Sequence, residues 1–250
     1  MKRTVKFFLP LLFFLSLALP SGGMEVKPAA LLSSPSVRVK GKREALKKAA
    51  KGESIVVSLL KGEEVRIDLG GEDSSSAGEL FLSYLCRGII ENESDYRAAE
   101  ARYPLYVQIV FDEKPDLSFR KSLLLFWRSI WNDRVWTRKS IVYAFTNRMP
   151  RGSVVNSEKT VALVSVGDET DVGREVRVTR DIARDFTLAY GAPPRGKIYR
   201  VVVGFDGPAK EGKVLEVRFD GLSISSPSGR VSLLGEEGDE FLHLPSRFLQ

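Results

Sequence analysis

The sequence predicts a mostly β protein, an antiparallel β-sandwich of jelly-roll type with two short packed helices. Three observations predict it. Nine segments between residues 54 and 224 alternate apolar and polar residues or are rich in β-branched residues. Only two stretches repeat apolar residues at helical spacing. The strand–helix alternation that is typical of parallel sheets is absent from the sequence; a layered α+β domain is the alternative.

The chain of 250 residues divides into four predicted regions. Residues 1–23 form a signal peptide, residues 24–52 a linker and short basic helix, residues 53–226 the β-sandwich domain, and residues 227–250 an irregular C-terminal tail. The linker is rich in Pro, Ser and Ala over residues 24–36. Gly52 is placed to end a basic helix at residues 40–51.

The N-terminal residues predict a periplasmic or secreted protein. Lys2, Arg3 and Lys6 precede an apolar run at residues 7–19, and small residues follow up to Gly23, as in a secretory signal. Retention of this segment as an anchor is the alternative. The run is shorter than the ~20 apolar residues of a membrane span, and no later stretch is longer, so we expect no transmembrane domain in the mature chain.

The predicted strands follow one another from residue 54 onward. Residues 64–69 set Val65, Ile67 and Leu69 against charged neighbours, which indicates a half-buried strand. The strand at residues 214–224 is expected to break at Asp220–Gly221. The complete set is residues 54–60, 64–69, 80–90, 103–112, 139–146, 160–166, 175–178, 197–205 and 214–224.

Two helices are expected to pack on this sheet framework. The first covers residues 117–131, and its apolar stripe predicts that Trp127 lies in the core. The second begins with Thr179 as N-cap and Asp181 in its first turn, and it ends at Gly191. The residues expected to face the sheet are Phe119, Leu123, Phe126, Trp127 and Ile130 in the first helix, and Ile182, Phe186, Ala189 and Tyr190 in the second.

No nucleic-acid partner is expected for an exported chain without a recognition motif, and its positive charge is local. The formal net charge is +6, and removal of Lys2, Arg3 and Lys6 with the signal leaves about +3. Much of the remaining positive charge falls in residues 40–51, which is typical of a solvated helix face or linker. Contact of this basic segment with an anionic surface, such as anionic lipid or lipopolysaccharide, is the alternative.

The content of histidine and cysteine restricts the available chemistry. His243 is the single histidine and Cys86 the single cysteine. Zinc sites built from Cys and His are therefore excluded, and no cofactor or metal is expected. Cys86 lies in an apolar strand pattern, so we interpret it as a small buried hydrophobic residue. A non-catalytic role is favoured over an enzyme, because general acid–base chemistry most often uses histidine.

Several motifs resemble those of a known family. They are Val107-Gln-Ile-Val-Phe-Asp112, Ser140-Ile-Val-Tyr-Ala-Phe145, Arg151-Gly-Ser153, Arg177-Val-Thr-Arg-Asp-Ile-Ala-Arg-Asp-Phe186, Tyr190-Gly-Ala-Pro-Pro194, Val201-Val-Val-Gly-Phe-Asp206 and Phe219-Asp-Gly-Leu222. Together they resemble a family of exported bacterial proteins of unknown function, DUF3047. The resemblance implies an exported sandwich like those that bind carbohydrates. The family's Trp-rich strand and Asp/Thr-rich turn are reduced here to Tyr84-Leu-Cys86 and Asp206-Gly-Pro208.

The candidate ligand-binding residues are Trp131, Trp136, Tyr143 and Asp206. All three tryptophans fall within residues 127–136, and flat aromatic rings can stack on sugar rings. Tyr143 and Asp206 belong to two of the motifs above. No catalytic or metal-binding residue is assigned. The acidic stretch Asp168, Glu169 and Asp171 is interpreted as a surface turn, with cation binding as the alternative.

Three functional hypotheses follow. The first is an exported, non-catalytic β-sandwich that binds a ligand such as a cell-envelope carbohydrate. The second is a glycan-processing enzyme whose carboxylates come from Asp112, Asp181, Asp185 or Asp206 and lie ~5–10 Å apart. The third is an envelope scaffold that binds another protein through the basic segment or an open sheet edge.

Overall fold

The computed structural model describes residues 24–25, 38–48, 54–69, 78–90, 101–131, 137–147, 149–156, 159–208 and 210–225. The predicted signal peptide, Trp136, His243 and the predicted C-terminal tail lie outside the described residues. In the part of the chain that is described, no helix is both long enough and apolar enough to span a membrane.

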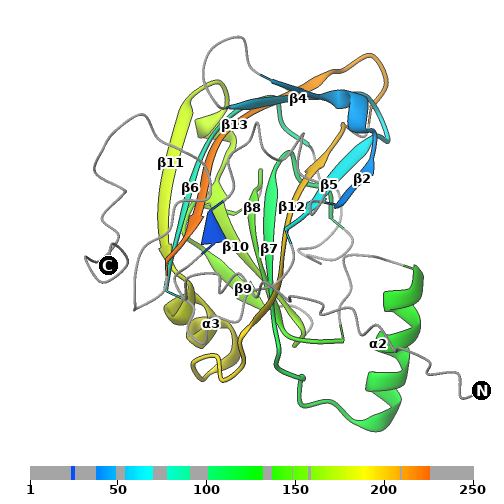
Figure 1. Ribbon diagram of the computed structural model, residues 1–250, viewed down its shortest axis with the longest axis vertical. Helices are drawn as coiled ribbons and strands as arrows, with labels where there is room; N and C mark the ends of the chain where they lie inside the picture. The colour runs from blue at the N-terminus through cyan, green and yellow to red at the C-terminus, as the bar shows by residue number, and fades with distance from the viewer. Residues whose placement is uncertain are drawn as a thin grey trace, which may run out of the picture.

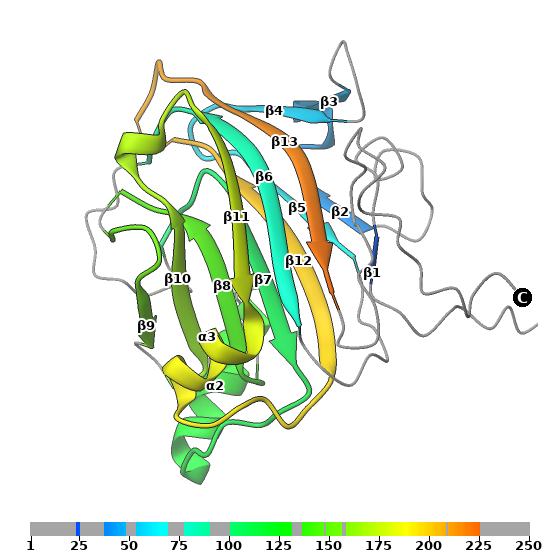
Figure 2. The ribbon, with the colours of Figure 1, turned by 90° about the vertical axis from the view of Figure 1, so that its left-hand side faces the viewer.

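Two β-sheets face each other (Figures 1 and 2). Sheet A has the order β11 (Glu175–Asp181), β6 (Glu79–Arg87), β13 (Leu215–Ile224), β4 (Ile55–Leu59) and β3 (Leu46–Lys48), with β1 (Met24–Glu25) also paired to β13. Sheet B has the order β2 (Arg38–Gly41), β5 (Glu64–Asp68), β12 (Ile198–Asp206), β7 (Tyr106–Phe111), β8 (Ser140–Phe145), β10 (Val161–Gly167) and β9 (Val154–Asn156).

Eight of these strands form a jelly roll. The strands β4, β13, β6 and β11 are neighbours in sheet A, and β5, β12, β7 and β8 are neighbours in sheet B. The chain passes repeatedly between the sheets, and the last strand, β13, lies beside the first, β4, which is the jelly-roll arrangement. The fold class predicted from the sequence is confirmed.

One pair of strands departs from the expected antiparallel pattern. Strand β10 pairs with β8 in parallel, with Val161 opposite Ser140 and Val164 opposite Tyr143. Between them the chain runs through β9, which pairs antiparallel with β10 on its far side. Because the chain reverses once before β9 and once after it, β10 enters the sheet in the same direction as β8.

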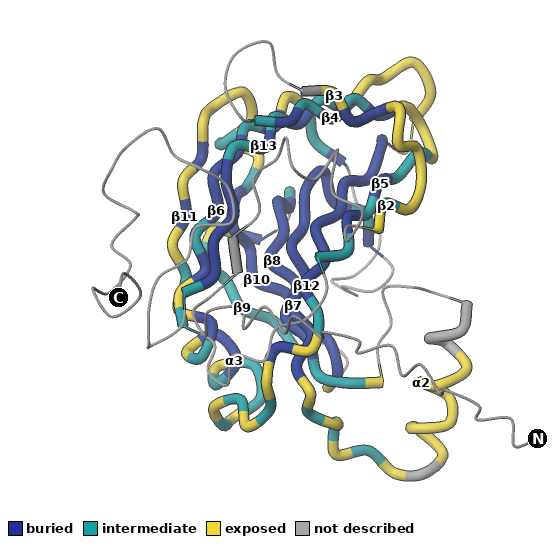
Figure 3. The backbone as a smooth tube through the Cα atoms, in the orientation of Figure 1, coloured by how far each residue is buried: buried dark blue, intermediate teal, exposed yellow. Residues whose placement is uncertain are grey.

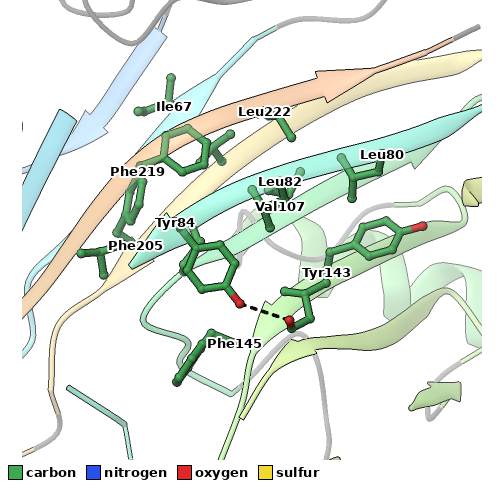
Figure 4. Close-up of a cluster of buried hydrophobic side chains, with 14 of the residues drawn as sticks. Ile67, Leu80, Leu82, Tyr84, Val107, Tyr143, Phe145, Phe205, Phe219 and Leu222 are labelled. Carbon is green, nitrogen blue, oxygen red and sulfur yellow. Dashed lines mark hydrogen bonds between the residues drawn. The ribbon is translucent and has the colours of Figure 1, made fainter. Parts of the chain in front are cut away.

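The main core fills the space between the two sheets. The close-up in Figure 4 shows side chains from both sheets meeting there, among them Tyr84, Phe145, Phe205 and Phe219. The Tyr84 hydroxyl donates a hydrogen bond to the carbonyl of Val166 at 3.2 Å, so the buried hydroxyl is satisfied across the sandwich. Cys86 is fully buried in this core, and burial raises the pKa of its thiol, which confirms its interpretation as a packing residue.

A second apolar cluster covers the outer face of sheet B. It joins Tyr103 and Tyr106 to Val142, Leu163 and Met149. Strands β7, β8 and β10 are therefore buried on both faces (Figure 3). A ligand cannot lie on this part of the sheet without displacing apolar side chains, so the surface open to a ligand is at the strand ends and on the loops.

The N-terminal region corrects the predicted short basic helix. Within residues 40–51, the described part consists of the end of β2, a three-residue 3-10 helix (Arg43–Ala45) and β3. Gly41 has a φ of +90°, which favours glycine, and the Lys42 amide donates to the Glu64 carbonyl at 3.0 Å. Strand β2 forms an edge of sheet B, and β3 forms an edge of sheet A. Their lysines disfavour pairing of these edges with strands of another molecule.

Helix α3 (Ile182–Tyr190) packs as the sequence predicts. Ile182 and Phe186 are fully buried against the core, and Gly191 ends the helix in the left-handed conformation. The N-cap is Asp181 and not Thr179, because β11 extends to Asp181 and keeps Thr179 in the ladder opposite Phe81. The Asp181 carboxylate accepts from the Arg184 amide at 2.9 Å.

Helix α2 (Phe119–Trp131) contradicts the prediction that both helices pack. Figures 1 and 2 show it projecting beyond the two sheets. Leu123, Leu124, Phe126 and Trp127 are exposed, Trp127 at 54%. The helix forms where the apolar stripe predicts it, but α2 has no extensive contact with another described element, whereas α3 contacts β9, β10 and β11.

Candidate functional site at the β7–β8 end

Two of the four predicted site residues are buried. Tyr143 is 0% exposed and faces the core between the sheets. Burial raises the pKa of its hydroxyl group. The hydroxyl lies near Asp185, but the two groups do not have hydrogen-bonding geometry. Asp206 is also fully buried, and its carboxylate accepts from the Tyr103 amide at 2.8 Å. Neither side chain reaches the surface, so neither can contact a ligand directly. The prediction that they bind the ligand is corrected: both have a structural role.

Of the two predicted tryptophans, only the backbone of Trp131 is described. Trp131 is the last residue of α2, and its side chain is not among those described; Trp136 lies outside the described residues. The chain re-enters the described structure at residue 137 and leads into β8. The surface beside this entry is the candidate site.

Strand direction creates this site. Strand β7 is antiparallel to both β8 and β12, so the end of β7 meets the beginnings of the other two. Asp112 and Glu113 follow β7, Arg138 and Lys139 precede β8, and Tyr199 is the second residue of β12. We call these five residues the β7–β8 end.

The inner part of the β7–β8 end is the Glu113–Lys139 ion pair. Glu113 accepts from the Lys139 amine and also from the Arg195 amide, the latter at 3.0 Å. Burial opposes ionisation, but the hydrogen bonds from Lys139 and Arg195 outweigh it and lower the pKa of Glu113. The Lys139 amine also lies 5.2 Å from the centroid of the Tyr190 ring, in cation–π range.

The outer part combines an aromatic ring with a second ion pair. The Arg138 guanidinium pairs with Asp112 and lies 4.0 Å from the centroid of the Tyr199 ring. Tyr199 is 44% exposed, so the ring and the stacked guanidinium both reach the surface. An aromatic ring, a planar guanidinium and carboxylates side by side can stack on a ring-shaped ligand and hydrogen-bond to its hydroxyl groups.

The carboxylates considered for catalysis all have structural partners. Asp112 pairs with Arg138, Asp181 caps α3, and Asp206 holds the Tyr103 amide. The fourth, Asp185, is almost fully buried and receives two hydrogen bonds from Arg180, one of them at 3.0 Å. This arrangement does not resemble an open acid–base pair.

The acidic stretch after β10 forms a turn. Asp168 caps the 3-10 helix Glu169–Asp171 by accepting from the Thr170 amide at 2.9 Å, and Asp171 accepts from the Asp168 amide at 3.1 Å. The hydrogen bonds from Thr170 lower the pKa of Asp168. Nowhere in the described ranges do three or more His, Cys, Asp or Glu residues gather as a metal site would require.

Sequence reasoning missed the β7–β8 end as a site, although a signal was present. An acidic pair, Asp112-Glu113, directly follows one buried strand, and a basic pair, Arg138-Lys139, directly precedes the next. In neighbouring antiparallel strands, residues that follow the first strand and residues that precede the second lie at the same end of the sheet. Opposite charges at these two places therefore indicate a polar cluster at that end. Tyr199 could not be found this way, because its position follows from the place of β12 beside β7.

Comparison with known proteins gives a family and a distant structural likeness. A solved structure of TmCBM61 in complex with beta-1,4-galactotriose aligns with a TM-score of 0.33 and 11% identity, covering 79% of this chain and 94% of that chain; a likeness this weak carries no inference about ligand. No curated protein matches. A family model described as "Protein of unknown function (DUF3047)" matches residues 78–216, which include all of the β7–β8 end. The chain therefore belongs to the DUF3047 family of proteins of unknown function.

Proposed function

We propose that the protein is an exported, periplasmic or secreted β-sandwich that binds a carbohydrate of the cell envelope without catalysis, through the β7–β8 end. The observation that carries this proposal is the exposed Tyr199 ring, stacked under Arg138 and bordered by Asp112. Sugar sites commonly combine an aromatic platform with a few convergent polar groups. Trp131 and Trp136 are close in sequence to Arg138 and are proposed to add further stacking surface.

The state of the carboxylates favours binding over hydrolysis. A glycosidase needs a carboxylic acid that stays protonated near neutral pH, which requires a raised pKa. At the β7–β8 end, the pKa of Glu113 is lowered and Asp112 forms an ion pair with Arg138. The ionised Glu113 carboxylate is therefore suited to accept hydrogen bonds from ligand hydroxyls rather than to donate a proton.

The test is titration of the protein with a panel of envelope glycans, followed by tryptophan fluorescence and calorimetry, with and without calcium. A Tyr199→Ala variant should weaken binding of the responding glycan about tenfold, because it removes the stacking ring. Val214→Ala changes an exposed side chain just before β13 in sheet A, on the other sheet from Tyr199, and serves as the matched control. Equal affinities of the two variants would refute the site, and no response to any glycan would refute the proposed ligand class.

Export is tested separately. The residues at positions 2–23 support a cleaved signal, so the N-terminus of the protein recovered from the periplasm or medium should be Met24. Mass spectrometry of each cell fraction distinguishes this from a retained anchor. Recovery of the uncleaved chain with the cytoplasmic fraction would contradict export.

A further inference from the structure

Helix α2 carries an apolar surface that faces solvent. Leu124 is 64% exposed, and Leu123 and Trp127 are also exposed, on a helix that projects from the sandwich (Figures 1 and 3). The Phe126 ring packs against the Trp127 ring with their centroids 6.1 Å apart. Large apolar surfaces of this kind on a protein mark contacts with another apolar phase or partner.

The charges of α2 are all of one sign. Arg120, Lys121 and Arg128 are its ionisable residues, and residues 119–131 contain no Asp or Glu. Arg120 and Lys121 are exposed. Between the β7–β8 end and the helix lie the exposed Lys114 and Asp116, whose charges are opposite, and the preceding Asp112 and Glu113 are paired with Arg138 and Lys139. The helix therefore complements an anionic surface.

We propose that α2 docks on the surface of an anionic phospholipid bilayer, lying in the plane of the headgroups. The combination of Trp, Phe and Leu with Arg and Lys, and without acidic residues, is the pattern of interfacial helices. A helix of 13 residues is about 20 Å long, too short to cross the ~30 Å hydrocarbon core but long enough to lie along its boundary. Tryptophan side chains are enriched at that boundary.

This inference goes beyond carbohydrate binding and assigns α2 a different partner from the β7–β8 end. The helix begins a few residues after Glu113, so a docked helix would hold the β7–β8 end near the bilayer. A protein partner would be expected to offer acidic side chains to Arg120 and Lys121, whereas a bilayer offers both phosphate groups and an apolar layer for Leu124 and Trp127.

The test is flotation of the full chain with vesicles of phosphatidylcholine alone and of phosphatidylcholine and phosphatidylglycerol in a three-to-one ratio. We expect binding to the anionic vesicles, with a blue shift of the emission of Trp127, because its indole ring is exposed on α2. The double variant Arg120→Glu with Lys121→Glu should lower partitioning about tenfold or more. The matched control, Arg174→Glu with Lys213→Glu, makes the same charge change at exposed residues outside both α2 and the basic segment of residues 40–51.

The apolar contribution is tested with Leu124→Ser and Trp127→Ser, which should weaken partitioning without changing the net charge. Equal losses in the α2 charge variant and its matched control would overturn the proposal, because they would indicate a general charge effect. Retained partitioning in the α2 variants would overturn it as well, and absence of vesicle binding by the parent chain would leave a protein as the partner of α2. Titration of the same variants with soluble glycan keeps this result separate from carbohydrate binding.

Discussion

Helices α2 and α3 are about equally amphipathic, yet α3 packs on the sandwich and α2 does not. The apolar face of α3 enters the core through Ile182 and Phe186, and the Phe186 ring lies 4.7 Å from that of Phe111. The apolar face of α2 remains in solvent. Amphipathic periodicity therefore identifies a face that can be buried, but not the surface that buries it.

The difference lies in polar contacts that fix α3 in place. The Asn156 amide group donates to the Ala189 carbonyl at 2.7 Å, and the Tyr190 hydroxyl donates to the Ser140 carbonyl at 2.8 Å. Arg180 of β11 forms a paired hydrogen bond with Asp185. Two strand side chains and one strand carbonyl thus bond to α3, and no comparable contact from a strand is described for α2.

The largest expected difference is between core and surface aromatic residues. Phe186→Ala should lower the free energy of unfolding by about 3–5 kcal/mol, because it removes a fully buried ring. Trp127→Ala should change it by less than about 0.5 kcal/mol, because its ring is exposed. Urea unfolding followed by circular dichroism measures both. Similar losses in the two variants would mean that α2 is packed in solution.

The Arg180–Asp185 pair should give the next largest effect. Asp185→Ala leaves a guanidinium that is 23% exposed without its buried partner, and we expect a loss of about 2 kcal/mol, below the ~3–5 kcal/mol of a fully buried pair. Glu175→Gln, in exposed pairs with Arg177 and Arg218, should cost less than about 1 kcal/mol. Thermal unfolding of both variants checks this, and equal costs would show that Asp185 does not anchor α3.

The caps of α3 should each contribute less. Asp181→Ala removes the acceptor for the Arg184 amide, and Gly191→Ala places a side chain at a φ of +81°. Each should lower the free energy of unfolding by about 1 kcal/mol. Arg184→Ala, at an exposed position of the same helix, is the control. Urea midpoints unchanged by the cap substitutions would mean that packing alone defines the ends of α3.

The smallest expected effect is the acid dependence of the β7–β8 end. The pKa of Glu113 is lower in the folded chain than its usual 4.5. The ionised carboxylate therefore stabilises the fold, and this contribution is complete at pH values above 4.5. This contribution is lost as the pH falls through the lowered pKa, and we expect it to be below about 1 kcal/mol. Glu113→Gln should flatten the decline of stability in this acidic range. An identical pH profile for the variant would contradict the linkage.

Most of the sheet framework could be predicted from the sequence. Alternation in β5 and the run of apolar residues in β8 gave their positions, and the break in β13 at Asp220–Gly221 coincides with a register shift. The pairing of β10 with β8 could not be predicted, because β9 has three residues of intermediate burial and no strong pattern. The family assignment from the motifs was correct.

The site was less predictable for a physical reason. Strand β8 is buried on both faces, so its sequence does not alternate between apolar and polar residues. The pattern therefore cannot show whether a tyrosine such as Tyr143 faces the core or the surface. An acidic residue at a strand end, such as Asp206, can hold a backbone amide as readily as a ligand. Tyr199 became a candidate only when β12 was placed beside β7, because its neighbours come from distant parts of the chain.

The place of β13 has a consequence for how the chain folds. It lies between β4 and β6, pairing Val217 with Val57 on one side and with Cys86 on the other. During synthesis the edges of β4 and β6 therefore remain open until the ribosome has released residues 215–224. A topology dominated by such distant pairings folds slowly and exposes strand edges to aggregation meanwhile. A truncation before residue 215 should accordingly yield an insoluble chain rather than a smaller sandwich.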